Sequence, residues 1–174
     1  MALIPARAGS KRFPGKNLAV INGKSLVRHA IEQAEESQWI DNIVVLSSDK
    51  KVKKIAGDYF HQEPEFLCGD YVQPEQYIKY IESKYDYNIL VLLQPSSFPR
   101  TSMSIDHCIS MLICSGVDSV ITANRRVSHH FIPNGGVYVM RRGKTPYNDN
   151  MAVLTVECID IDYKKDLEMI NALL

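Results

Sequence analysis

Four basic side chains lie within residues 5–17, interleaved with small residues that let a backbone approach a ligand closely. The basic residues are Arg7, Lys11, Arg12 and Lys16, and the small ones are Ala6, Ala8, Gly9 and Ser10. Successive backbone N–H groups can form a concavity that binds an anion, and the four positive charges suit a polyanion such as a nucleoside triphosphate. The spacing differs from the Walker A motif, because five residues rather than four separate Gly9 from Gly15 and because Asn17 stands where Ser or Thr is required. We therefore expect a phosphate-binding loop of another type.

Two carboxylates near the carboxyl terminus, Asp160 and Asp162, are two residues apart. On a strand both would face the same way, with Cα atoms roughly 6–7 Å apart. Mg²⁺ is typically held by one or two carboxylates together with phosphate oxygens and water, so this pair predicts a magnesium site. A divalent cation would also let two carboxylates approach a polyphosphate without strong repulsion. The alternative is a pair of solvated acids at the end of a strand.

The charge balance hides an asymmetry along the 174 residues. The net charge is zero, yet residues 1–31 carry six basic side chains and no acidic one, while the rest of the chain has a balance of −6. Duplex nucleic acid requires an extended basic face, so we do not expect nucleic acid as a partner. No apolar run is long enough to span a bilayer, and the early charge at Arg7 leaves no room for a signal peptide. The four widely spaced cysteines predict reduced, mostly buried thiols, and we expect a cytoplasmic protein.

The elements that would position these residues alternate between strands and helices. Short apolar runs predict strands at residues 2–4, 43–46, 89–93, 117–122, 137–140 and 153–158. Helical spacing covers residues 26–34 behind Ser25, 105–113 behind Thr101, 74 to about 84, and 167–173. This order predicts a single α/β domain over residues 1–174, a Rossmann-like, mostly parallel sheet with helices on both faces. Ligands of such sheets bind beyond the carboxyl ends of the strands, where the basic loop and the carboxylate pair would both lie.

Several segments resemble the acylneuraminate cytidylyltransferases in family order. Ile4–Asn17 (IPARAGSKRFPGKN) is similar to the amino-terminal signature of that family. Leu92–Arg100 (LLQPSSFPR) resembles a second family block, and Ile159–Asp162 (IDID) resembles its metal-binding D-x-D pair. Weaker similarity extends over residues 47–49, 64–70 and 134–138. The family activates acidic sugars of the sialic type as CMP conjugates, on a fold of the nucleotide-diphospho-sugar transferase type.

The resemblance implies a reaction and a role for each matched residue. CMP from CTP would be joined to an acidic, nonulosonic sugar with release of pyrophosphate, in a Mg²⁺-dependent reaction. The catalytic residues would be Arg7, Lys16 and Asp162, and the metal would be held by Asp160 and Asp162. The base and sugar would be bound by Gln94, Ser96 and Arg100. The nucleotide would be bound by Arg7, Ala8, Gly9, Ser10, Lys11, Lys16 and Asn17, with Asn17 reaching the cytosine.

Two departures from the family keep other functions open. The excursion that carries much of the family's dimer contact is missing near residues 131–133, which leaves a homodimer undecided. Glu63 stands where relatives tend to have Arg, a reversal that would weaken the hold on an anion. The alternatives are a nucleotidyltransferase for a smaller acid (a Kdo-like sugar or a phosphonate), one that uses another base, and a catalytically silent nucleotide-binding relative.

Overall fold

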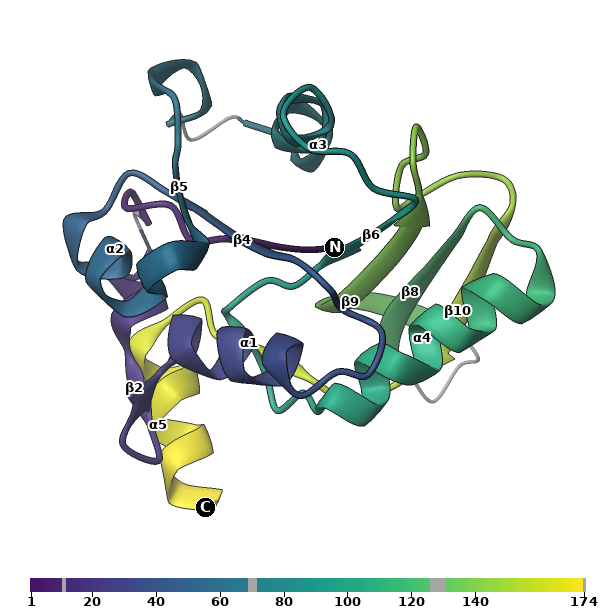
Figure 1. Ribbon diagram of the computed structural model, residues 1–174. Coiled ribbons are helices and arrows are strands. Elements are labelled where there is room, and N and C mark those ends of the chain that lie inside the picture. Colours follow the sequence, from purple (N-terminus) through teal and green to yellow (C-terminus); the bar gives the residue numbers. More distant parts are fainter. Residues whose placement is uncertain (11, 69–71, 126–130, 174) are drawn as a thin grey trace.

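The computed structural model describes residues 1–10, 12–68, 72–125 and 131–173 (Figure 1). Its main sheet has seven strands in the order β10-β8-β9-β6-β1-β4-β5. These strands are β1 (Ala2–Pro5), β4 (Ile43–Ser47), β5 (Phe60–Gln62), β6 (Ile89–Leu92), β8 (Ser119–Arg125), β9 (Phe131–Arg141) and β10 (Met151–Thr155). All neighbours pair in parallel except β9, which runs antiparallel to both β6 and β8. The predicted mostly parallel α/β sheet is confirmed.

Helices cover both faces of this sheet, as expected. They are α1 (Leu26–Glu35), α2 (Lys50–Ala56), α3 (Pro74–Glu82), α4 (Ser102–Ser115) and α5 (Lys164–Leu173), with 3-10 turns at Lys16–Leu18, Gly57–Tyr59 and Glu65–Leu67. Ile4 packs with residues of α1, α2 and α4, whereas its neighbour Leu3 packs with residues of α3. Side chains alternate across a strand, so adjacent residues of β1 anchor opposite layers. Not one described helix combines the length and the apolar character required to cross a membrane.

The side chains of Ser25 and Thr101 accept hydrogen bonds from backbone N–H groups in the first turns of α1 and α4. Both predicted N-caps are thereby confirmed. The strand expected over residues 153–158 ends earlier, at Thr155, because the backbone of Cys158 bonds with the side chain of Asn124 instead. The cysteines are reduced, but only Cys108 and Cys158 are buried.

Two small antiparallel sheets flank the main one. β2 (Val20–Ile21) and β3 (Lys24–Ser25) form a hairpin whose turn residues, Asn22 and Gly23, both have positive φ. β7 (Ser97–Phe98) pairs with β11 (Ile159–Asp160). A third apolar cluster joins Ile21 and Leu26 to Ile161 and Ile170, so α5 packs beside the amino-terminal hairpin. The carboxyl-terminal helix is thereby held against the segment that contains Ile21 and Leu26.

The structure places residues 131–133 at the start of β9, where Phe131 and Pro133 pair with Arg125 and Ala123 of β8. Residues 126–130 lie outside the described part of the chain. The missing dimer excursion and the single-domain boundary remain predictions.

Candidate active site

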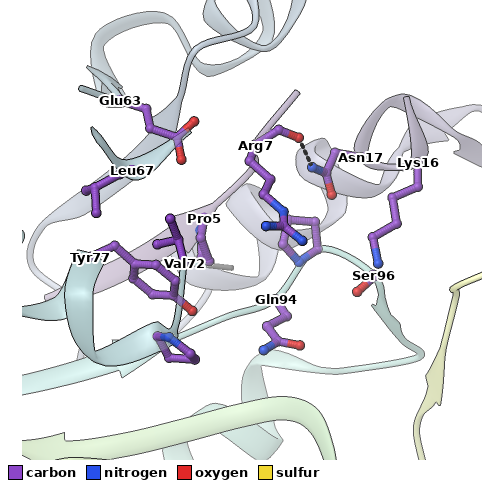
Figure 2. Close-up of a pocket in the computed structure, with 12 residues that line it drawn as sticks. Pro5, Arg7, Lys16, Asn17, Glu63, Leu67, Val72, Tyr77, Gln94 and Ser96 are labelled. Carbon is purple, nitrogen blue, oxygen red and sulfur yellow. Dashed lines mark hydrogen bonds between the residues drawn. The ribbon is translucent and has the colours of Figure 1, made fainter. Parts of the chain in front are cut away.

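A cavity lies where the strands β1, β5 and β6 end (Figure 2). Pro5 ends β1, Glu63 follows β5, and Gln94 follows β6 closely; the 3-10 turn at Lys16 and the helix α3 complete the wall. The residues that line it are Pro5, Arg7, Lys16, Asn17, Glu63, Leu67, Val72, Pro74, Tyr77, Gln94, Pro95 and Ser96. This is the position at which open parallel sheets bind their ligands.

Hydrogen bonds hold the basic loop in a curled path beside β1. The Asn17 side chain, 7% exposed, donates from Nδ2 to the carbonyl oxygen of Arg7 at 3.0 Å. Ser47 Oγ donates to the carbonyl oxygen of Ala6 at 2.6 Å. The amide of Asn17 therefore fastens the loop, in addition to lining the cavity where a base contact was expected.

The two oppositely charged segments converge beside the cavity. Lys16 Nζ lies 3.0 Å from Asp162 Oδ1, and Arg12 Nη1 lies 2.8 Å from Asp162 Oδ2. The Asp162 backbone is held in turn, because the neighbouring Ile161 N–H donates to the carbonyl oxygen of Ser96 and the Asp162 N–H donates to Asp166. A hydrogen bond with Tyr163 and the charge of Asp162 raise the pKa of Arg12. Residues 146 positions apart in sequence thus form one ion-paired cluster.

The expected metal ligands are Asp160 and Asp162, and two carboxylates alone leave coordination positions that a substrate would fill. Asp160 ends β11 and is exposed, whereas Asp162 is half-buried beyond the strand. Among the residues described, no three His, Cys, Asp or Glu side chains gather in a way that could hold a metal ion. Asp162 pairs with Lys16, a residue of the cavity wall, and carboxylates together with phosphate oxygens are the donor set of Mg²⁺. The donor types present therefore fit a Mg²⁺ ion whose remaining ligands would come from a phosphate-bearing substrate.

The cavity wall also contains two residues to which the sequence assigned no binding role. Glu63, 7% exposed, has its carboxylate Oε2 3.1 Å from the donating Ser48 Oγ, and burial raises its pKa against the opposing effects of Ser48 and Arg7. Tyr77, which falls within the helix expected from residue 74 to about 84, lines the wall, and burial raises its pKa. Its place three residues after Pro74, at the start of a helix that follows β5, is the signal that could have placed it there.

The residues expected to bind the nucleotide, together with Gln94 and Ser96, separate into three groups. Arg7, Lys16, Asn17, Gln94 and Ser96 line the cavity. Ala8, Gly9 and Ser10 belong to the loop without lining it, and Ser10 Oγ accepts from the Phe13 N–H. Lys11 lies outside the described residues.

Arg100 is enclosed in the protein rather than placed in the cavity. It is 5% exposed, and its Nη1 donates to the carbonyl oxygens of Gln94 (3.1 Å) and Gly136 (2.7 Å). Its Nε donates to Gln33 Oε1 at 2.9 Å. Burial lowers the pKa of Arg100 to about 10, so the group stays charged at neutral pH. The geometry gives Arg100 the task of positioning the Gln94 segment, in place of the expected substrate contact.

Comparison with known proteins agrees with the geometry. Residues 1–68 match the family model described as cytidylyltransferase. The chain is 33% identical over 120 residues to the CMP-N,N'-diacetyllegionaminic acid synthase of Legionella pneumophila, which covers 64% of this chain and 52% of that protein. The N-acylneuraminate cytidylyltransferase of Escherichia coli is 34% identical over 115 residues, 64% of this chain and 27% of that protein. The chain is therefore similar in sequence to acylneuraminate cytidylyltransferases over part of its length. It spans about half the length of the first of these two relatives and about a quarter of the second.

Solved structures confirm the fold. CMP:2-keto-3-deoxy-manno-octonic acid synthetase in complex with CTP superimposes with a TM-score of 0.78 at 16% identity, over 99% of this chain and 96% of that one. The 4-diphosphocytidyl-2C-methyl-D-erythritol synthase of Anaerococcus prevotii gives 0.71 at 13% identity, over 99% and 94%. At such identities the likeness concerns the architecture of the fold alone.

Proposed function

We propose that this protein transfers CMP from CTP to an acidic sugar of the nonulosonic type and releases pyrophosphate in a Mg²⁺-dependent reaction. The observation that carries the proposal is that Arg7 and Lys16 line one cavity beyond the ends of β1 and β6, while Asp162 pairs with Lys16 beside it. The sugar's anomeric hydroxyl oxygen would form a bond to the α-phosphorus, and the bond from that phosphorus to the bridging oxygen would break. Alignment and charge stabilisation are what such a displacement needs from a protein.

The chain's own residues would supply both. Arg7 and Lys16 face the cavity with positive charge that stabilises the phosphate oxygens and the departing pyrophosphate. Asp162 holds the Lys16 ammonium in place before the ligand arrives. Asp160 and Asp162 would hold Mg²⁺, which when bound neutralises phosphate charge. Arg100 keeps the Gln94 carbonyl, and with it the Gln94–Ser96 segment, at the cavity wall.

Relatives' names support an acidic acceptor. The name of the Legionella protein specifies diacetyllegionaminic acid, and the name of the Escherichia coli protein specifies N-acylneuraminate. A Shewanella relative, 51% identical over 51 residues, is named as an 8-amino-3,8-dideoxy-manno-octulosonate cytidylyltransferase. All three acceptors are acidic sugars. The shared chemistry is the carboxylate of the sugar, and the individual sugar is what an experiment has to identify.

A pyrophosphate-release screen tests the proposal. CTP, UTP, ATP and GTP are each offered with a panel of acidic sugars, with Mg²⁺ and with excess chelator. We expect release with CTP, Mg²⁺ and one class of acidic sugar. Release with another nucleotide would replace CTP in the proposal, and CTP binding without release for any acceptor would make the protein a silent nucleotide-binding relative.

A further inference from the structure

Glu63 is a buried carboxylate in the cavity that phosphate binding does not use. Among the described residues that line the cavity it is the only acidic one. Its backbone N–H donates to the carbonyl oxygen of Ser47 at 3.0 Å, and its Oε2 accepts from Ser48 Oγ at 3.1 Å. The first bond fixes the backbone of Glu63 and the second fixes its side chain in the wall of the cavity. A buried carboxylate needs a hydrogen-bonding role, because its desolvation is costly.

Its position within the cavity indicates what it can bind. Figure 2 shows Glu63 and Leu67 on the side opposite Lys16 and Ser96, with the carboxylate directed toward Arg7. Leu67, Val72 and the ring of Tyr77 make that side largely apolar. One end of the cavity thus offers cations, and the other offers largely apolar surface whose polar groups are the Glu63 carboxylate and the Tyr77 hydroxyl. A nucleotide has the same layout, since its charge lies on the phosphates and its base is flat and neutral.

We propose that Glu63 accepts a hydrogen bond from the exocyclic amino group of cytosine and thereby selects this base; the inference rests on the proposed function. A carboxylate repels phosphate and the sugar acid, so the ligand group that binds Glu63 has to be a hydrogen-bond donor without negative charge. Glutamate and aspartate accept hydrogen bonds from the N4 amino group of cytosine. Uracil has a carbonyl oxygen in this place, which would face the carboxylate oxygen without a proton between them.

The two replacements used below separate the acceptor from the bulk of the side chain. Glutamine keeps a carbonyl oxygen that can accept from N4, whereas leucine has no acceptor.

Equilibrium binding of three triphosphates tests the assignment without requiring turnover. The ligands are CTP, UTP and the triphosphate of pyrimidin-2-one riboside, which differs from CTP only in lacking the amino group. We expect the unaltered protein to bind CTP about 10- to 100-fold more tightly than either of the others, the range for a well-placed base contact. Glu63→Leu should remove this preference and Glu63→Gln should keep it. Glu65→Leu, which removes an exposed acid two positions away, is the matched control and should change nothing.

Other results would overturn the assignment. Equal affinity of the unaltered protein for CTP and the pyrimidin-2-one triphosphate would do so without any variant. A Glu63→Leu change that shifts all three affinities by one common factor would make Glu63 a counter-charge for Arg7. If none of the triphosphates binds, the proposed function falls and the role of Glu63 with it. The protein could also prefer CTP in a way that depends on Glu63 and yet release no pyrophosphate. This result would contradict the proposed transfer reaction and support the role of Glu63.

Discussion

Asp162 is the residue on which the charge arrangement of the site turns. Its two carboxylate oxygens are taken by Lys16 and Arg12, which come from the opposite end of the sequence. A lysine side chain loses considerable rotamer freedom when it is fixed, up to about 2 kcal/mol. In this protein the ion pair with Asp162 fixes the Lys16 side chain before the ligand binds. A phosphate group would therefore bind to a cation that is already in place.

Replacing Asp162 by Ala should abolish Mg²⁺-dependent pyrophosphate release from CTP. The change removes an expected metal ligand and the partner that positions Lys16, and the loss of one such electrostatic contact typically costs roughly 100- to 1,000-fold in turnover. Initial rates at saturating CTP measure the effect. Glu168→Ala removes an exposed acid of α5 and serves as the control. Unchanged turnover in the Asp162 variant would remove the metal assignment.

Glu63→Gln should make the folded protein more stable at neutral and alkaline pH. Burial holds the pKa of Glu63 above its unfolded value, so the folded state binds this proton more tightly. Its contribution to the free energy of unfolding is fully present below the unfolded pKa and is lost as the pH rises through the folded pKa. Urea denaturation at a series of pH values should therefore show that the unfolding free energy of the variant increases relative to that of the unaltered protein as the pH rises. The exposed Glu65→Gln should show no such trend, and parallel curves for both variants would contradict the prediction.

Arg100 shows what residue patterns can and cannot establish about a site. The basic loop was predicted from residue types and from its position at a strand end, and Gln94 and Ser96 were predicted from the family resemblance. The structure brings residues of both segments to one cavity. Arg100 follows the same strand, but its direction depends on Gly136 and Gln33, whose backbone and side chain receive it from distant parts of the sequence. Tyr77 and Leu67 line the cavity because α3 and a 3-10 turn fold over the sheet. The periodicity of the local sequence does not predict this tertiary arrangement.

At the scale of elements, α5 secures the carboxyl-terminal side of the site. Ile170 and Ile161 pack with Ile21 and Leu26, and β11 pairs with β7 next to Ser96. The position of Asp162 therefore depends on apolar packing of Ile161 and Ile170 against Ile21 and Leu26.

Ile170→Ala should weaken both stability and turnover. Ile170 is 4% exposed, and truncating such a side chain costs about 2–5 kcal/mol of unfolding free energy. Loosening of α5 should also lower the rate of pyrophosphate release, because Asp162 precedes the helix directly. Chemical denaturation and steady-state rates measure the two effects. Leu173→Ala, at an exposed position of the same helix, should leave both unchanged, and a stable Ile170 variant would show that α5 docks by other contacts.

The elements that the sequence predicted well are those with long, periodic patterns. The stripes beginning at Leu26 and Ile105 correspond to α1 and α4, with their N-caps at Ser25 and Thr101. The two-residue strands β2, β3, β7 and β11 were missed, because two residues contain no period and their pairing depends on distant segments. For the same reason Asp160 and Asp162 were expected on one strand, whereas only Asp160 belongs to β11.

At the scale of the whole molecule, charge is distributed unevenly in a protein with no net charge. The first 31 residues carry six basic side chains and no acid, and their loop reaches the cavity through Arg7 and Lys16. The remaining residues carry the acidic excess. A polyanion is therefore attracted to one place on the molecule, while the surface as a whole stays neutral.

CTP affinity should fall with ionic strength, while cytidine affinity should not. Salt shortens the Debye length from about 10 Å at 0.1 M to about 3 Å at 1 M, which screens the attraction between the basic loop and the phosphates. Between about 50 mM and about 500 mM NaCl we expect roughly a tenfold weakening for CTP. Calorimetric titrations of CTP and of cytidine measure the two dependences. Equal salt dependence for both ligands would show that the phosphates do not contact the basic loop.

The 146 positions between Lys16 and Asp162 have a consequence during synthesis. At about 5–20 residues per second, the basic loop leaves the ribosome roughly 7–30 seconds before its carboxylate partner does. A nascent chain therefore carries its cations without their counter-ion, beside ribosomal RNA that is itself a dense polyanion. Only a chain translated through Asp162 can close this ion pair, so a prematurely terminated product cannot assemble the catalytic charge arrangement.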